Sequence, residues 1–149
     1  MTKTFSGEYR HSLDSKGRLI VPAKFREILG SHFWIGRGFD KCLQIYDDED
    51  WESFSQSLKE LPKNSDKARK LVRYFMSGTM EVEIDKQGRI LLPPQLREQA
   101  GIDKNVVFVG MGTRGELWSE EAYDAYETET TAEDISAISE ELLTSGFQI

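Results

Sequence analysis

The chain alternates between short apolar runs with strand periodicity and longer stretches with helical periodicity. Residues 5–13 and 79–85 place apolar and polar side chains alternately, which is typical of a half-buried strand. We expect the first of these strands, with Tyr9, His11 and Leu13 on one face, to pair with the apolar run Leu19–Val21 across the intervening turn.

A seventeen-residue pattern occurs twice. Residues 14–30 read DSKGRLIVPAKFREILG and residues 85–101 read DKQGRILLPPQLREQAG, and seven positions are identical. Such a repeat predicts two copies of one supersecondary unit. In each copy we expect a turn at Gly17 or Gly88, a short strand, and a short helix that follows a proline. The helices, over 23–29 and 94–100, should end at glycines.

Each copy continues with a second hairpin and a helix. The hairpins are predicted over 33–46 and 106–118, and Asp47 and Ser119 are good N-caps for the helices that follow. A further helix is predicted over 66–76, inside a connector (63–77) that has no evident counterpart in the second copy.

The C-terminal segment differs in charge. The chain has a net charge of −7, but residues 127–149 carry six acids and no Lys or Arg, whereas the other 126 residues carry 20 acids and all 19 bases. A helical stripe of Ile135, Ile138 and Leu142 runs through this tail. The stripe would dock on the body or on a neighbouring subunit, or remain loose. We expect the tail to repel phosphate and to be dispensable for assembly.

Catalysis finds little support in the sequence. There is one cysteine, Cys42, two isolated histidines, no zinc-spaced Cys/His cluster, no glycine-rich phosphate loop and no nucleophile elbow. We therefore predict no enzyme, cofactor, metal or small-molecule substrate. No apolar run or N-terminal signal indicates a membrane or an exported protein, and the single cysteine fits a reducing cytoplasm.

The two turns carry the best binding candidates. Cations at a loop tip suit phosphates, and Arg suits bidentate contact with guanine; the candidates are Lys16, Arg18, Lys86 and Arg89. An Asp that begins a turn accepts backbone N–H bonds and can pair with the Arg four residues later. We therefore expect orienting or structural roles for Asp14, Gly17, Asp85 and Gly88.

The paired D-x-x-x-R turns, the run GRLIVPAKFRE, the opening FSGEYRHSLD and the order of hairpins and helices resemble the MraZ family over roughly residues 4–126. The resemblance implies an α+β fold, mainly β with short helices. Two tandem AbrB/SpoVT-like swapped-hairpin units would form a double-split β-barrel, with a connector helix and a C-terminal acidic helix. We expect the units at 8–50 and 79–122, the connector at 51–78 and the acidic tail at 123–149.

The same resemblance implies a cytoplasmic, nucleoid-associated transcriptional regulator. It would act as a ring-shaped homo-oligomer on direct repeats in double-stranded DNA, upstream of the division and cell-wall gene cluster. Carried over by position, Lys16 and Arg18 are the leading DNA contacts. Gln87 replaces the lysine in the second copy, where Lys86 would compensate. The rival interpretation is a structural or protein-interaction module whose acidic, apolar-striped tail binds a partner protein.

Overall fold

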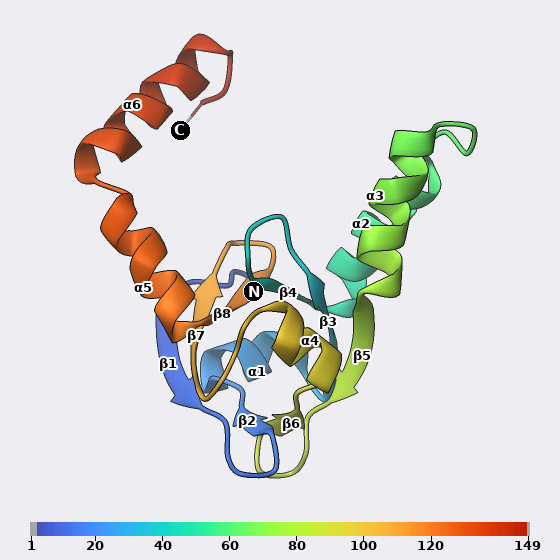
Figure 1. Ribbon diagram of the computed structural model, residues 1–149, viewed down its shortest axis with the longest axis vertical. Helices are drawn as coiled ribbons and strands as arrows, with labels where there is room; N and C mark the ends of the chain where they lie inside the picture. The colour runs from blue at the N-terminus through green and yellow to red at the C-terminus, as the bar shows by residue number, and fades with distance from the viewer. Residues whose placement is uncertain (1–2, 149) are drawn as a thin grey trace.

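The computed structural model describes residues 3–148, which form an α+β protein with antiparallel sheets and six helices (Figure 1). The first repeat contains β1 (Glu8–Ser12), β2 (Arg18–Ile20), α1 (Ala23–Leu29), β3 (His32–Arg37), β4 (Leu43–Tyr46), α2 (Asp48–Lys59) and α3 (Asp66–Ser77). The second contains β5 (Thr79–Glu83), β6 (Arg89–Leu91), α4 (Pro94–Gln99), β7 (Asn105–Gly110), β8 (Gly115–Ser119), α5 (Glu120–Glu129) and α6 (Ala132–Thr144).

The element order is therefore the same in both repeats. The expectation that the 63–77 segment has no counterpart is wrong, because α6 occupies in the second repeat the place that α3 has in the first. The equivalence is not evident in the sequence, because α3 is rich in basic residues whereas α6 is rich in acidic ones.

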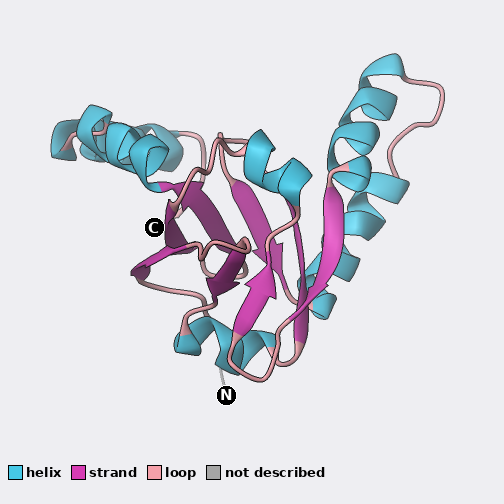
Figure 2. Cartoon of the chain, turned by 60° about the horizontal axis from the view of Figure 1, so that its bottom comes forward, coloured by secondary structure: helices cyan, strands magenta, loops and turns pink. Residues whose placement is uncertain are grey.

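Most strands form one sheet, and a small ribbon forms a second. The six-stranded sheet has the order β1-β7-β8-β4-β3-β5, and the second sheet consists of β2 and β6. Figure 2 shows the strands in magenta at the centre of the molecule, with the helices around them in cyan. The hairpins β3–β4 and β7–β8 pair as predicted. Four further pairings join the two repeats: β1 with β7, β2 with β6, β3 with β5 and β4 with β8.

The predicted pairing of the first strand with Leu19–Val21 is wrong. The chain does turn between them, since the Asp14 N–H donates to the Arg18 carbonyl at 2.9 Å, but β1 and β2 then diverge to separate partners. The exchange sets the apolar residues Leu19 and Ile90 opposite each other, and both are fully buried. One shared core results, which two isolated hairpins would not supply.

The core lies between the sheets and the short helices α1 and α4. Phe25 of α1 is fully buried and meets the rings of Phe5, Tyr9 and Phe108 edge-on, with centroids 5.0–5.7 Å apart. Both helices end as predicted near a glycine with positive φ, Gly30 (79°) and Gly101 (64°). The two copies therefore contribute equivalent helices to one core.

Two helical arms leave this body on opposite sides (Figure 1). Helix α2 is capped by Asp47, and Trp51 stacks on Trp34 of β3 with centroids 5.5 Å apart. Helix α3 buries Phe75, and α5 buries Tyr123 against the sheet. Across residues 3–148, no helix is both long and apolar enough to cross a membrane.

Candidate nucleic-acid interface

The two predicted turns lie side by side at the lower end of the molecule, where β2 and β6 form a two-stranded antiparallel ribbon (Figure 1). In this ribbon Arg18 is opposite Leu91, and Arg89 is opposite Ile20. The central pair, Leu19 and Ile90, points into the core. Because side chains alternate along a strand, both arginines share the outer face of the ribbon.

The first turn is closed by the Asp14 carboxylate. Its Oδ1 accepts the backbone N–H groups of Lys16 and Arg18, each at 2.9 Å, and its Oδ2 accepts Arg18 Nε at 2.7 Å. These bonds, led by the Arg18 backbone N–H, lower the pKa of Asp14. Asp14 therefore remains a carboxylate at neutral pH and fixes the direction of the Arg18 side chain.

The second turn repeats this geometry with one difference. Asp85 Oδ1 accepts the backbone N–H groups of Gln87 and Arg89 at 2.9 Å, and Oδ2 accepts Arg89 Nε at 3.0 Å. In addition, Gln87 Oε1 accepts Arg89 Nη2 at 2.5 Å. Among residues 3–148, no acceptor holds either Nη of Arg18. Both Nη atoms of Arg18 are therefore available to hydrogen-bond a ligand, whereas Arg89 has only Nη1 available.

Each turn also holds the strand of the other repeat. Val21 N–H donates to the Gly88 carbonyl at 2.9 Å, and Leu92 N–H donates to the Gly17 carbonyl at 3.0 Å. Both glycines have a left-handed backbone, with φ of 77° for Gly17 and 80° for Gly88, which other residues adopt only with strain. The two turns are therefore fixed relative to each other.

The exposed cations complete a basic surface. Lys16 and Lys86 are exposed at the tips of the two turns. Arg26 of α1 lies against Gly88 in the second turn, where together with Lys86 it lines an open hollow of about 400 Å³. Its equivalent Arg97 of α4 lies near Gly17 but donates from Nε to the Ile102 carbonyl at 3.1 Å.

We did not predict Arg26 as a site residue from the sequence. Its recurrence as Arg97 was a signal in the sequence, since Arg26 occupies one of the seven identical positions of the repeat. An arginine in a predicted helix nevertheless gave no reason to place it beside the turn of the other copy. Only the exchange of strands between the repeats makes Arg26 a neighbour of Lys86.

Other reactive side chains have ordinary structural explanations. Cys42 is buried, and burial raises the pKa of its thiol. Among the described residues, one group could hold a metal: His32, Asp48 and Glu81, whose ligand atoms lie within 4.8 Å of one another. His32 Nε2 already hydrogen-bonds Asp48 Oδ2 at 2.8 Å, which raises the pKa of His32. An imidazole that hydrogen-bonds Asp48 and lies 3.6 Å from Glu81 Oε2 accounts for this group.

Comparison with known proteins gives the family. A family profile described as "MraZ protein, putative antitoxin-like" matches twice, at residues 4–74 and 75–145, which together span nearly the whole chain. The chain belongs to the MraZ family. The two matches are the two repeats seen in the fold, and the second ends just after α6, as the first ends within α3.

Several curated MraZ relatives are close in sequence. A transcriptional regulator MraZ of Lachnoclostridium phytofermentans is 52% identical over 81% of this chain and 85% of its own length. One from Desulforamulus reducens is 52% identical over 86% of this chain and 90% of its own length. One from Moorella thermoacetica is 48% identical over 93% of this chain and 96% of its own length. All three are named as transcriptional regulators and not as enzymes.

Proposed function

We propose that this MraZ-family chain is a sequence-specific DNA-binding transcriptional regulator. It acts as a ring-shaped homo-oligomer on direct repeats upstream of the division and cell-wall gene cluster. The bacterial relatives named as transcriptional regulators support the general class. The resemblance of the turns to those of the family supports the particular target and the ring.

The single observation that carries the proposal is the β2–β6 ribbon. It presents one arginine from each repeat, Arg18 and Arg89, on the same outer face, and each is held by a carboxylate of its own turn. A two-stranded antiparallel ribbon is narrow enough to enter the major groove of B-DNA. The proposal therefore places the face of the ribbon against base edges.

The surrounding residues suit two kinds of contact. A terminal Arg nitrogen pair can bind the O6 and N7 acceptors of guanine, and Ile20 and Leu91, both exposed on the same ribbon, suit the methyl group of thymine. Lys16, Lys86 and Arg26 are placed beside the ribbon, where they would bind phosphates and set its register.

One ribbon makes few contacts, so a single copy would bind weakly at physiological salt. A ring that presents identical ribbons to successive direct repeats makes the later binding events intramolecular, and avidity then supplies affinity. The two AbrB/SpoVT-like units (8–50 and 79–122) would close as a double-split barrel that carries the ribbon. Such a regulator works in the cytoplasm at the nucleoid.

Footprinting of the full chain on the DNA upstream of the division and cell-wall gene cluster tests the proposal. We expect protection of regularly spaced direct repeats, and loss of protection as salt rises. A scrambled fragment of the same composition is the control. Equal, salt-sensitive binding to both fragments would leave a non-specific DNA binder, and no retention at low salt would favour the protein-interaction alternative.

A further inference from the structure

The β2–β6 ribbon is nearly symmetric in its pairing. Rotation by 180° about an axis through the middle of the ribbon exchanges Arg18 with Arg89 and Leu19 with Ile90. Two-fold symmetry of a DNA-binding element matches two-fold symmetry in the site that it binds. A ribbon whose side chains obeyed this symmetry would therefore fit a DNA site equally well in either direction.

The two arginines of the ribbon break this symmetry. Arg18 keeps both Nη atoms available, whereas Gln87 Oε1 accepts one of those of Arg89. An arginine reads guanine with two donors, one for O6 and one for N7. The Arg18 end of the ribbon is therefore suited to a bidentate contact with guanine, and the Arg89 end is not.

The equivalent arginines of the two short helices break the symmetry in the opposite sense. Arg97 of α4 is engaged by its own segment, because its Nε donates to the Ile102 carbonyl at 3.1 Å and its Nη2 donates to the Asp103 carbonyl. Arg26 of α1 has no acceptor among residues 3–148, and its Nη1 lies so close to Gly88 that a Cβ there would clash with it. The second turn therefore carries an arginine that is available to an anion, whereas the arginine near the first turn is already engaged.

Arg26 is placed where a phosphate group can be bound. Together with Lys86 it lines the open hollow of about 400 Å³ beside the second turn. Asp85 is the one acid of that described lining, and its carboxylate already accepts the backbone N–H groups of Gln87 and Arg89 and the Nε of Arg89. Two cations beside an open hollow suit the DNA backbone, to which proteins bind for position rather than for sequence.

We propose that each ribbon binds its DNA repeat in one direction only: the first turn reads bases through Arg18, and the second turn holds the backbone through Arg26 and Lys86. This inference rests on the proposed function, because it specifies which way each copy lies on its repeat. In a closed ring the copies are related by rotation, so all of them present their ribbons in the same sense. Ribbons with one direction require sites with one direction, and the ring would select direct repeats over inverted ones.

Inversion of one repeat tests the direction. One fragment carries three direct repeats, and in the other only the middle repeat is inverted about its own centre. We expect wild type to bind the second fragment about tenfold more weakly, since the inverted repeat places mismatched bases against Arg18. Equal affinities for the two fragments would overturn the direction.

Gln87→Lys tests what sets the direction at the base edges. The substitution gives the second turn the residue of the first and releases Nη2 of Arg89. We expect the ratio between the two affinities to fall by about threefold or more, because both ends of the ribbon can then form a bidentate contact. An unchanged ratio would overturn the assignment of Gln87.

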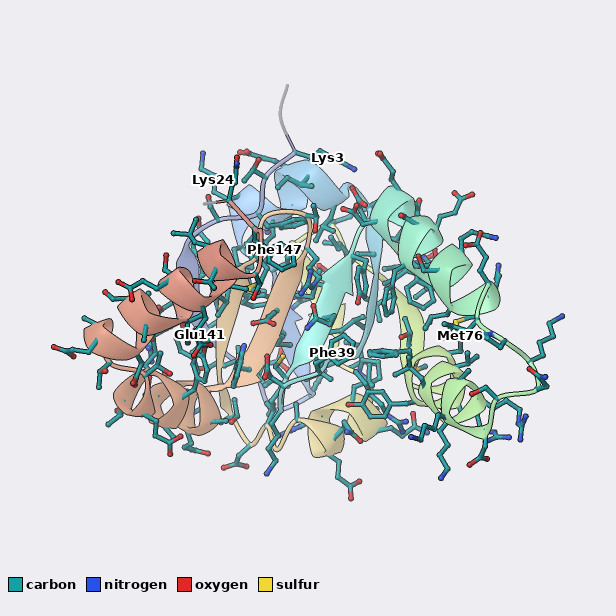
Figure 3. The ribbon with its side chains drawn as sticks, turned by 90° about the horizontal axis from the view of Figure 1, so that it is seen from above. Lys3, Lys24, Phe39, Met76, Glu141 and Phe147 are labelled. Carbon is teal, nitrogen blue, oxygen red and sulfur yellow. The ribbon has the colours of Figure 1, made fainter. Side chains whose placement is uncertain are left out.

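Arg26→Ala tests the phosphate contact. It should weaken binding to repeat and scrambled DNA alike, and the slope of log affinity against log salt should become shallower by about 1 for each bound copy. Two controls should leave the slope unchanged. Lys24→Ala removes an exposed cation of α1 that lines a different hollow together with Lys3, at the same edge of the molecule (Figure 3). Arg97→Ala should instead lower the melting temperature, because it removes hydrogen bonds to two backbone carbonyls.

An Arg26→Ala slope equal to that of wild type, or an equal change of slope in Arg97→Ala, would overturn the phosphate site. Melting temperatures and sedimentation confirm that the Arg26 and Gln87 variants are folded and assembled. The same measurements separate this inference from the proposed function. No retention of wild type on either fragment would refute the proposed DNA binding and, with it, the direction, whereas specific and equal binding to both fragments would refute the direction alone.

Discussion

Arg18 and Arg89 occupy equivalent positions in the two repeats but differ in how many of their nitrogens are engaged. Both donate Nε to the Asp of their own turn, whereas only Arg89 also gives Nη2 to a side chain, Gln87. A guanidinium with a terminal nitrogen already engaged is less free to form a bidentate pair with guanine. Because Gln87 stands where the first turn has Lys16, we expect Arg18 of the first repeat to contribute more to the proposed reading of bases than Arg89.

We expect Arg18→Ala to cost about 1–3 kcal/mol of DNA-binding free energy for each base contact that it removes, and to relax specificity. Arg89→Ala should cost less. Fluorescence anisotropy on target and scrambled DNA measures both, and Lys41→Ala, an exposed cation in the β3–β4 loop, serves as control. Oligomer size and melting temperature should be measured on the same samples. An equally stable Arg18→Ala oligomer with wild-type affinity would remove this turn from the interface.

Lys16→Ala should weaken binding to all sequences alike, because an exposed lysine at the turn tip binds phosphate rather than a base edge. The slope of log affinity against log salt should become shallower by about 1 for each phosphate that the lysine no longer neutralises. A salt titration of Lys16→Ala beside wild type measures this slope. A sequence-dependent weakening with an unchanged slope would instead make Lys16 a base-reading residue.

The His32 group predicts a pH dependence of stability. The hydrogen bond to Asp48, followed by the charges of Asp48, Glu81 and Glu83, raises the folded pKa of His32 above 6.5. Its stabilisation is therefore complete below pH 6.5 and disappears as pH rises through the raised pKa. His32→Gln should lower the melting temperature at about pH 5.5 and have little effect at about pH 8.5.

The other histidine provides an internal control for this prediction. Burial and the charge of Arg26 lower the pKa of His11, so its protonation favours the unfolded chain as pH falls below 6.5. His11→Gln should therefore relieve a loss of stability at low pH, opposite in sign to His32→Gln. Melting curves of both variants from about pH 5 to 9 measure the difference, and parallel curves would contradict both assignments.

At the level of helices and strands, the main feature is that strands of one repeat pair with strands of the other. Each of the four strands β1 to β4 pairs with a strand of the second repeat, namely β7, β6, β5 and β8. Leu19 and Ile90, the central residues of the ribbon, meet only in this shared core. Neither repeat therefore contains all of the partners that its own backbone N–H and C=O groups require.

A fragment of residues 1–78 should not fold as a monomer. It keeps the β3–β4 hairpin but leaves β1, β2 and the second edges of β3 and β4 without partners, and small hairpins are marginal in water. Circular dichroism should show no cooperative unfolding for the dilute fragment, and mixing it with residues 79–149 should restore a transition. A cooperative transition of the 1–78 monomer would contradict the shared core.

At the scale of the whole molecule, charge is segregated. The six acids of the tail account for nearly all of the net charge of −7, while the cations gather at the turns and along the α2–α3 arm. We expect the acidic tail to repel phosphate and the basic turns to attract it.

The assembled ring should bind several direct repeats much more tightly than one. We expect wild type to gain about 10²-fold or more in affinity between fragments with one and three repeats. A chain that binds as a monomer would gain only the statistical factor of about three. Electrophoretic mobility shifts on the two fragments measure this gain, and a gain no larger than the statistical factor would argue against avidity.

The local pattern of the sequence determined much of this protein. Periodicity and the repeat located the short helices, both second hairpins and helices α2, α3 and α5, because apolar spacing, prolines, caps and glycines act within a few residues. The same local chemistry predicted the Asp–Arg turns, since the bonds of Asp14 and Asp85 span only four residues. The resemblance to the MraZ family rested on the same residues, and the family matches confirm it.

Tertiary structure decided which strands meet. An alternating strand shows that one face is apolar but does not specify its partner, so the sequence led to a local pairing of the first strand, whereas burial of Leu19 against Ile90 joins the repeats. The same exchange placed Arg26 beside the second turn and both arginines on one ribbon face. The groove between α2 and α3 likewise depends on how two helices pack against each other, which the apolar pattern within each helix does not specify.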